Sequence, residues 1–411
     1  MRKLDTFIIG GGLAGLFSAL VLKSKHPEKK IAIAAFGAGS LPMSSGTIDF
    51  LSRDARGKFL KSPLAGIQKL PNHHPYKKIG IESIKQAVEF FRDFSAEWSL
   101  PYDGSLERQT PVVTSLGTIK SAALTQISMD ASPLKYAQKI IVVGINGVKD
   151  FFPNVLVENL QKIFPQKQIE SVNIDFISNP RRDPLILDIA RILDSNEGIQ
   201  KFADQLKSKV ESKTMFITPP IFGTQGASSH GAAESLLESK ICETTCLPPS
   251  PTGIRLQKIL RDSLHKLGIS ILENMKIVSS EIENRRVKSV KTSSGKIFEA
   301  DRFILAAGKF FSGGIEMNQF NSPREPIFNL PIFFEPSENQ WSHEDFFMPQ
   351  GFEKTGILID ENLKPIDASG KLILENVAII GEILGGFDFT ASGSNSGIAI
   401  ASAFKAGDID E

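Results

Sequence analysis

A glycine-rich turn near the N-terminus has the spacing of a phosphate-binding loop. The segment Gly10-Gly11-Gly12-Leu13-Ala14-Gly15 fits the pattern Gly-x-Gly-x-x-Gly. Gly10 permits a tight turn, Gly12 lets the backbone approach a phosphate, and Gly15 lets the next helix pack closely on a sheet. The free N–H groups at the start of that helix favour an anion. The turn therefore predicts a nucleotide cofactor that is contacted by Gly10, Gly11, Gly12, Ala14 and Gly15.

Two arginines and two histidines could bind an anion or take up a proton. Arg255 and Arg324 lie in apolar or turn-forming segments, where a guanidinium is costly unless it is paired with an anion. That anion could be a phosphate or an internal carboxylate, for example Glu325 beside Arg324. His73 and His74 are candidate catalytic bases, with a structural or surface role as the alternative.

The elements around the turn alternate between strands and helices. A short apolar strand over Leu4 to Ile9 precedes it, a helix over Leu13 to Lys25 follows it, and a second buried strand covers Ile31 to Ala35. A buried strand ending at Ala306 and a strand–turn–helix over residues 377–406 return to the same sheet. This order predicts an α/β fold with a split, Rossmann-like domain of the FAD/NAD(P)-binding type, built on a parallel sheet.

The middle of the chain is more polar and predicts a second domain. We expect residues 1–50, 250–310 and 372–411 to form the Rossmann-like domain, and residues 51–249 and 311–371 to form an inserted α+β cap that contacts substrate and partners. Within the cap, the segment from Lys139 to Gly147 imitates a second strand and glycine turn. It has only two glycines, which favours an ordinary strand-to-helix connection over a second nucleotide site.

Charge and cysteine content exclude several classes of function. The chain of 411 residues has 47 Lys and Arg against 46 Asp and Glu. It has no overall basic field, so we expect no nucleic-acid partner. Cys242 and Cys246 are too few for a disulfide framework, a structural zinc site or an iron–sulfur cluster, so no metal site and a reducing, cytoplasmic compartment are expected. The uncharged run from Thr6 to Leu22 follows Asp5 and contains three glycines, which argues against a signal peptide or membrane anchor.

Motifs spread along the chain resemble those of one flavoprotein family, the B subunit of the anaerobic glycerol-3-phosphate dehydrogenase. The resemblance spans nearly the whole length. Its motifs, in order, are Ser44-Ser45-Gly46-Thr47-Ile48-Asp49, His74-Pro75-Tyr76, Val142-Val143-Gly144-Ile145, Gly253-Ile254-Arg255-Leu256-Gln257, Phe310-Phe311-Ser312-Gly313-Gly314, Arg324-Glu325-Pro326-Ile327, Asp345-Phe346-Phe347 and Leu384-Gly385-Gly386-Phe387-Asp388.

The resemblance implies a flavoprotein subunit of a membrane-associated complex of anaerobic respiration. Such a complex oxidises sn-glycerol 3-phosphate to dihydroxyacetone phosphate and passes the electrons to quinone. The implied partners are a second flavoprotein subunit and an iron–sulfur subunit that docks the assembly on the inner face of the cytoplasmic membrane. Two alternatives stay open: a non-catalytic, electron-relay subunit that binds flavin in the same complex, and a stand-alone flavin-dependent oxidoreductase acting on another small acid.

The end of the second strand bears on which flavin is bound. A dinucleotide site normally has an acid about 20 residues beyond the glycine turn to hold a ribose hydroxyl. This chain has Ala34-Ala35-Phe36-Gly37-Ala38 there, and its next acid is Asp49. The missing acid favours FMN, which the resemblance also implies, with FAD as the alternative if another group replaces the acid.

Further flavin contacts are expected at four turns. Ser44, Ser45 and Gly46 are candidates for contacts to the flavin ring, with an ordinary turn as the alternative. The N-terminus of a helix starting near Gly397 could stabilise the negative charge of a reduced flavin. The remaining candidates are Ala307, Gly308, Gly385 and Gly386.

Overall fold

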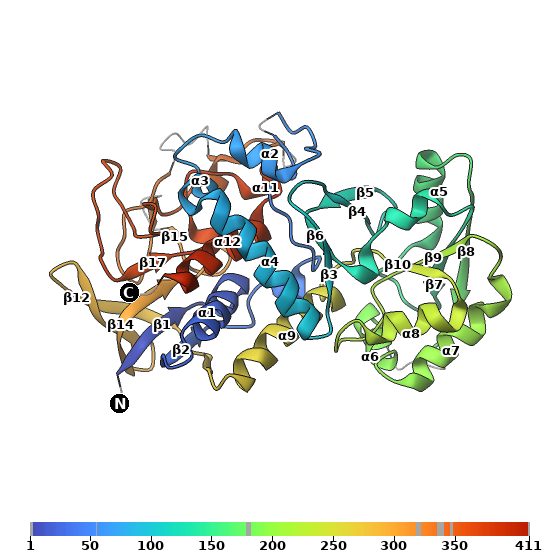
Figure 1. The fold of residues 1–411 in the computed structure, drawn as a ribbon, viewed down its shortest axis with the longest axis horizontal. Coiled ribbons are helices and arrows are strands. Elements are labelled where there is room, and N and C mark those ends of the chain that lie inside the picture. Colours follow the sequence, from blue (N-terminus) through green and yellow to red (C-terminus); the bar gives the residue numbers. More distant parts are fainter. Residues whose placement is uncertain are drawn as a thin grey trace. The chain divides into compact units, whose positions relative to one another are not determined.

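The computed structural model divides the chain into two compact units (Figure 1). The first comprises Met1–Ser40, Asp49–Phe91 and Leu260–Glu411, and the second comprises Leu41–Ile48 and Arg92–Ile259. Within these ranges the structure describes residues 3–54, 56–177, 182–317, 322–334, 341–345 and 348–409. Phe346 and Phe347, which belong to one of the family motifs, lie outside the described residues.

The first unit is built on a seven-stranded mixed sheet with the order β11-β2-β1-β14-β13-β12, and β17 pairs with β14 off this path. β1, β2, β11, β14 and β17 run parallel, whereas β12 and β13 are antiparallel to their neighbours. The strands are β1 (Leu4–Ile9), β2 (Ile31–Ala35), β11 (Ser270–Glu273), β12 (Ile277–Glu283), β13 (Arg286–Thr292), β14 (Ile297–Leu305) and β17 (Val377–Ile379). The predicted Rossmann-like parallel core is confirmed, with strands from both ends of the chain.

Helices of small and apolar residues cover this sheet. α1 is buried along most of its length and lies beside α12, as Figure 1 shows. Phe17 of α1 makes edge contacts with Phe90 and Phe91, which join the same apolar layer. The helices described in this unit include α1 (Leu13–Lys25), α2 (Pro63–Gln68), α3 (Pro75–Ile79), α11 (Phe389–Ser392) and α12 (Asn395–Asp408). Short 3-10 turns occur at Gly351–Lys354 and Gly381–Ile383, and β15 (Glu316–Met317) pairs with β16 (Pro323–Arg324).

The second unit has its own parallel sheet, in the order β10-β9-β7-β8. Its strands alternate with helices, and a large apolar cluster fills its core. The segment from Lys139 is the buried strand β7 leading to a helix, so the predicted strand-to-helix connection is confirmed. The sheet and its helices comprise β7 (Lys139–Ile145), α5 (Pro153–Ile163), β8 (Gln168–Ile174), α6 (Ile186–Ile192), α7 (Asn196–Leu206), β9 (Thr214–Thr218), α8 (Ser228–Leu237) and β10 (Lys240–Glu243). Two antiparallel pairs lie outside this sheet, β3 (Tyr102–Gly104) with β6 (Leu124–Gln126) and β4 (Thr110–Val113) with β5 (Ile119–Ala122). Short 3-10 turns occur at Leu41–Met43, Ile127–Met129, Ser132–Lys135 and Lys207–Lys209.

The boundaries between the units differ from the expected ones. Residues 51–91 and 311–371 were expected in the cap, yet they belong to the unit that holds the Rossmann-like sheet. The reason is packing, because Tyr76 stacks on Phe50 and Ile357 pairs through its backbone with Leu384. Residues 41–48 and 250–259 were expected in the Rossmann-like domain, yet they belong to the second unit. Two long helices, α4 (Ile81–Glu97) and α9 (Pro251–Lys266), contain points where the chain passes from one unit to the other. None of the helices in the described ranges is long and apolar enough to span a membrane.

Candidate functional site

The glycine turn connects β1 to α1, and two of its glycines are required by the turn itself. Gly10 has a φ of +124°, and a Cβ built on it would lie 2.1 Å from the carbonyl oxygen of Ala306. A Cβ on Gly15 would lie 1.9 Å from the carbonyl oxygen of Gly10. A side chain at either position would collide with backbone, so the fold explains both glycines as the spacing predicts.

Gly12 differs, because no contact with another protein atom requires a glycine at this position. It is the N-cap of α1 with φ −82° and ψ −175°, which any residue can adopt, and a Cβ built on it meets nothing within 4 Å. No side chain caps α1, and its first turn has no acidic residue. Open space therefore lies beside Gly12 at a helix N-terminus, and a helix N-terminus is an environment that binds a phosphate. The residues present fit the phosphate of a flavin nucleotide.

The ends of neighbouring strands line up with this turn. An added Cβ on Gly10 would also lie 3.2 Å from the backbone nitrogen of Ala307, which follows β14. Gly308 has a φ of +71°, and the Ser312 hydroxyl donates to the Ala307 carbonyl at 2.7 Å. A Cβ on Gly381, after β17, would lie 2.8 Å from the Cβ of Ala14. The structure thus brings the predicted Ala14, Ala307 and Gly308 to the glycine turn.

Among the remaining predicted glycines of this unit, Gly385 and Gly397 have packing explanations, whereas Gly386 has a φ of +81°. Gly385 lies against Gly356, and an added Cβ would come within 2.7 Å of its backbone. The Gly386 N–H donates to the Lys354 carbonyl at 2.9 Å. Gly397 lies inside the first turn of α12, and a Cβ there would meet Phe50 and Tyr76 at 2.7 Å. Because protein atoms fill the space at Gly385 and Gly397, their side-chain positions leave no room for a ligand.

Lys309 is a buried cation near the glycine turn that the sequence reasoning missed. It follows Gly308, is buried, and its ammonium donates to the backbone oxygen of Glu353. The ammonium also lies 5.4 and 4.9 Å from the ring centroids of Phe387 and Phe389. Burial lowers the pKa of Lys309 to about 8, although nearby carboxylates oppose the change. The signal in the sequence was a lysine that directly follows a buried strand and a glycine.

Three carboxylates surround this lysine. They belong to Glu353, Glu382 and Asp388. Burial raises the pKa of Glu353 and of Glu382 above the ordinary value, while Lys309 acts in the opposite direction. The Thr390 hydroxyl donates to a Glu353 carboxylate oxygen at 3.2 Å. Burial thus shifts the pKa values of Lys309, Glu353 and Glu382 toward neutral pH, near the end of β14, and perturbed groups of this kind are common at functional sites.

The two candidate histidines have different surroundings, and neither is supported as a base. His73 is exposed. His74 is buried, and its Nδ1 accepts the N–H of Tyr76 at 3.1 Å, which caps α3. Burial, followed by the neighbouring His73, lowers the pKa of His74 to about 4. With Nδ1 occupied and the ring neutral, His74 holds the start of a helix and has no free lone pair for a substrate proton.

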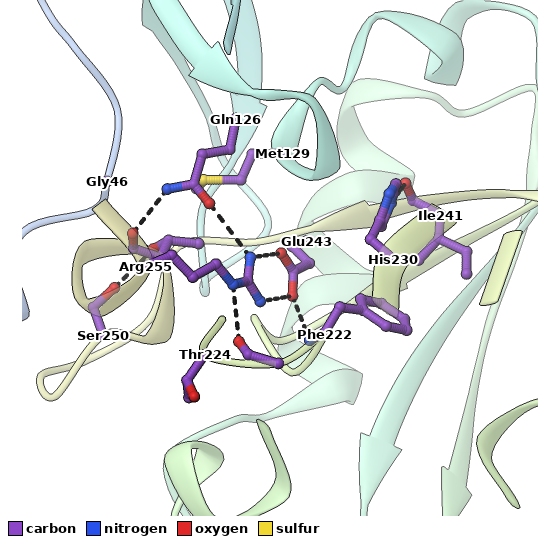
Figure 2. A network of polar contacts seen from close by, with 12 residues as sticks. Gly46, Gln126, Met129, Phe222, Thr224, His230, Ile241, Glu243, Ser250 and Arg255 are labelled. Atoms are coloured by element: carbon purple, nitrogen blue, oxygen red, sulfur yellow. Dashed lines mark hydrogen bonds and ion pairs between the residues drawn. The ribbon is translucent and has the colours of Figure 1, made fainter. Parts of the chain in front are cut away.

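Arg255 does not offer its charge to a phosphate, contrary to the prediction. Figure 2 shows its guanidinium facing the carboxylate of Glu243, with Nη1–Oε2 at 2.6 Å and Nη2–Oε1 at 2.9 Å. Its Nε donates to the Gly223 carbonyl at 2.9 Å, and Nη1 also reaches Oε1 of Gln126 at 3.4 Å. Arg255 is 1% exposed and Glu243 is fully buried. The anion that neutralises Arg255 is internal, which was the alternative interpretation of this arginine.

Burial alone would raise the pKa of Glu243, but the guanidinium of Arg255 outweighs it and holds that pKa below its ordinary value. The carboxylate also accepts the Phe222 N–H at 2.8 Å. The pair therefore joins the start of α9 to the loop after β9 and to the end of β10.

Arg324 pairs with a carboxylate other than the expected one. Its Nη2 lies 2.9 Å from Oε2 of Glu316, across the β15–β16 pair, in an exposed position. Glu325, the example given for an internal carboxylate partner, instead accepts backbone N–H groups from Ile327 and Phe328, both at 2.7 Å. Arg324 is thus engaged by a surface ion pair.

Ser44, Ser45 and Gly46 lie in the second unit, in the 41–48 loop. The Tyr102 hydroxyl donates to the Gly46 carbonyl at 2.6 Å, and the Thr252 hydroxyl donates to the Ser45 carbonyl at 2.8 Å. The Ser44 hydroxyl donates to the Leu41 carbonyl at 2.8 Å. Contacts inside the unit therefore fix this loop; its predicted contact with a flavin ring stays a prediction.

The two cysteines lie in environments that suppress reactivity. Burial raises the pKa of Cys242 far above its ordinary value and that of Cys246 to about 11. Both thiols stay protonated at neutral pH, as expected for inert cysteines.

Comparisons with known proteins agree with the geometry of the turn. A family model described as "FAD binding domain" matches residues 5–398. Relatives named as the B subunit of anaerobic glycerol-3-phosphate dehydrogenase include those of Aliivibrio fischeri, 30% identical over 98% of this chain and 94% of the relative, and of Yersinia pseudotuberculosis, 30% identical over 98% and 96%. Among solved structures, a 3-ketosteroid delta1-dehydrogenase from Sterolibacterium denitrificans has a TM-score of 0.47, with 10% identity over 99% of both chains.

The family match supports a flavin as the cofactor and favours FAD over the FMN that the missing acid suggested. The family description names FAD, and the match covers the glycine turn and β17 and ends in the first turn of α12. The chain therefore belongs to the FAD binding domain family and, within it, to the family formed by the B subunit of anaerobic glycerol-3-phosphate dehydrogenase.

Proposed function

We propose that this chain is a flavin-binding subunit of a glycerol-3-phosphate dehydrogenase that oxidises sn-glycerol 3-phosphate to dihydroxyacetone phosphate. The observation that carries the proposal is the match to relatives of that name over 98% of the chain. The open space in front of Gly12 supports it, because a phosphate-bearing cofactor gives that glycine a purpose. In this proposal, electrons pass through an iron–sulfur subunit to quinone. That partner docks the assembly on the inner face of the cytoplasmic membrane, and a second flavoprotein subunit completes the complex.

FAD is the cofactor that we propose. When bound, a flavin supplies the acceptor for the hydride that leaves the carbinol carbon of the substrate. The residues of this chain hold and orient it: the backbone of Gly11 and Gly12 and the N-terminus of α1 face its phosphates. The hydroxyl proton of the substrate also needs an acceptor. Lys309 is a group at this edge of the sheet that exchanges a proton near pH 8.

Bleaching of bound flavin tests which step the chain performs. The isolated, flavin-loaded chain is mixed anaerobically with glycerol 3-phosphate, and its visible flavin absorbance is followed. Bleaching by the substrate supports oxidation of the alcohol by this chain. Bleaching by dithionite but not by substrate contradicts it and identifies an electron-relay subunit instead.

Steady-state assays then separate the subunit from a stand-alone enzyme. Turnover with quinone is measured for the chain alone and after addition of the co-purified partner subunits. We expect turnover only in the assembled complex. Full quinone reduction by the chain alone would refute the need for partners.

A further inference from the structure

The carboxyl end of β2 has an exposed aromatic ring where a dinucleotide site normally has an acid. Ala35, the last residue of β2, is buried, and its Cβ lies only 2.6 Å from the place of a Cβ on Gly11. The next residue, Phe36, is 67% exposed. A ribose-binding carboxylate is therefore absent from this position, and an aromatic side chain is available beside it.

The backbone places Phe36 next to the phosphate-binding turn. β1 and β2 are parallel neighbours, with Ile9 opposite Ala34, and the Gly10 N–H donates to the Ala34 carbonyl at 2.9 Å. After Phe36 the chain folds back on the turn, since a Cβ on Gly39 would lie 3.1 Å from the Cα of Gly12. The adenosine half of a dinucleotide extends from its phosphates toward this edge of the sheet.

A cation accompanies the ring. The ammonium of Lys276 lies 5.8 Å from the ring centroid of Phe36. The segment before it is held against β2, because the Met275 N–H donates to the Ala35 carbonyl at 3.0 Å. An aromatic face beside an ammonium suits a planar base that is linked to a pyrophosphate, since the ring stacks on the base and the cation favours the anion.

We infer that Phe36 binds the adenine ring of FAD by stacking and replaces the acid that usually holds the ribose. The inference rests on the proposed function, in which the cofactor is FAD. It explains how this chain retains the adenosine half without a carboxylate. It also assigns to an exposed side chain a ligand contact that the glycine turn alone does not provide.

Titration of the full-length apoprotein with FAD and with FMN tests the inference, with quenching of flavin fluorescence as the signal. The parent chain binds FAD more tightly than FMN. Phe36→Ala weakens FAD binding by roughly ten- to hundredfold, the range expected for loss of one base–aromatic stack, and leaves FMN binding unchanged. Phe36→Trp keeps the preference for FAD, and ADP quenches the additional indole emission of this variant.

Phe59→Ala is the matched control. Phe59 belongs to the same unit, is 51% exposed, and also has a cation over its ring, with Arg53 at 4.4 Å. This variant should bind both flavins as the parent does. If the parent binds FMN as tightly as FAD, the proposal of FAD fails. The parent could instead prefer FAD while Phe36→Ala keeps that preference or loses affinity for both flavins equally. Either result would overturn the inference about Phe36 and leave the proposal of FAD as the cofactor intact.

Discussion

Replacement of Arg255 by methionine should destabilise the second unit without affecting flavin binding. Methionine fills much of the same volume but leaves the Glu243 carboxylate buried, with one backbone N–H from Phe222 at 2.8 Å as its remaining bond in Figure 2. It also removes the donor to the Gly223 carbonyl. Breaking a buried ion pair from one side costs about 3–5 kcal/mol, because the remaining charge is not compensated. We expect a loss of unfolding free energy of this size for Arg255→Met.

Urea unfolding of the full-length chain, followed by circular dichroism, measures this loss. Arg324→Met is the matched control, because the Arg324–Glu316 pair is exposed and should contribute only about 0–1 kcal/mol. The double variant Arg255→Met/Glu243→Leu should recover most of the stability, since it removes the unpaired charge. An Arg255→Met protein that unfolds at the same urea concentration as the parent but is purified without flavin would refute the reasoning and restore Arg255 as an anion ligand.

Three further predictions concern the first unit. Gly12→Val should fold as stably as the parent and be purified colourless, since a Cβ at this position meets no protein atom within 4 Å. Gly15→Ala should unfold at lower urea, because its Cβ meets backbone. The unfolding free energy of the parent relative to Lys309→Met should rise between about pH 8 and 10.5, because in this range the unfolded chain holds a proton that the folded chain has released. Urea titrations at several pH values measure this difference in unfolding free energy. A difference that does not change with pH would contradict the lowered pKa. His74→Ala should lose about 1 kcal/mol of unfolding free energy, because it removes the N-cap of α3. His74→Asn should recover most of this loss, because asparagine also caps a helix. An equal loss in both variants would show that the cap does not contribute to stability.

Local patterns predicted the first elements of the fold well. The strand Leu4–Ile9, the helix Leu13–Lys25 and the strand Ile31–Ala35 have the predicted bounds, because each is an apolar run delimited by glycine or charge. β14 differs by one residue at its end: the strand was expected to end at Ala306, and it runs from Ile297 to Leu305 through the charged Asp301 and Arg302. Its charged residues are tolerated because Arg302 donates to the Ile409 carbonyl and Asp301 is exposed.

The partners of charged residues could not be predicted, because tertiary packing selects them. Arg255 and Glu243 belong to different elements, and only the packing of α9 near the end of β10 brings them together. Conversely, Glu325 is next to Arg324 in the sequence but turns toward backbone N–H groups. Sequence spacing therefore identified where costly charges lie and did not identify what neutralises them.

The order of segments along the chain also determines when each sheet can form during synthesis. β1 emerges from the ribosome early, but its neighbour β14 is at residues 297–305. At roughly 5–20 residues per second, β1 waits on the order of tens of seconds for that strand. The parallel sheet of the second unit lies within residues 139–243 and needs no such delay. We therefore expect the inserted unit to fold co-translationally, while the apolar edge of β1 depends on chaperones until the last third of the chain is made.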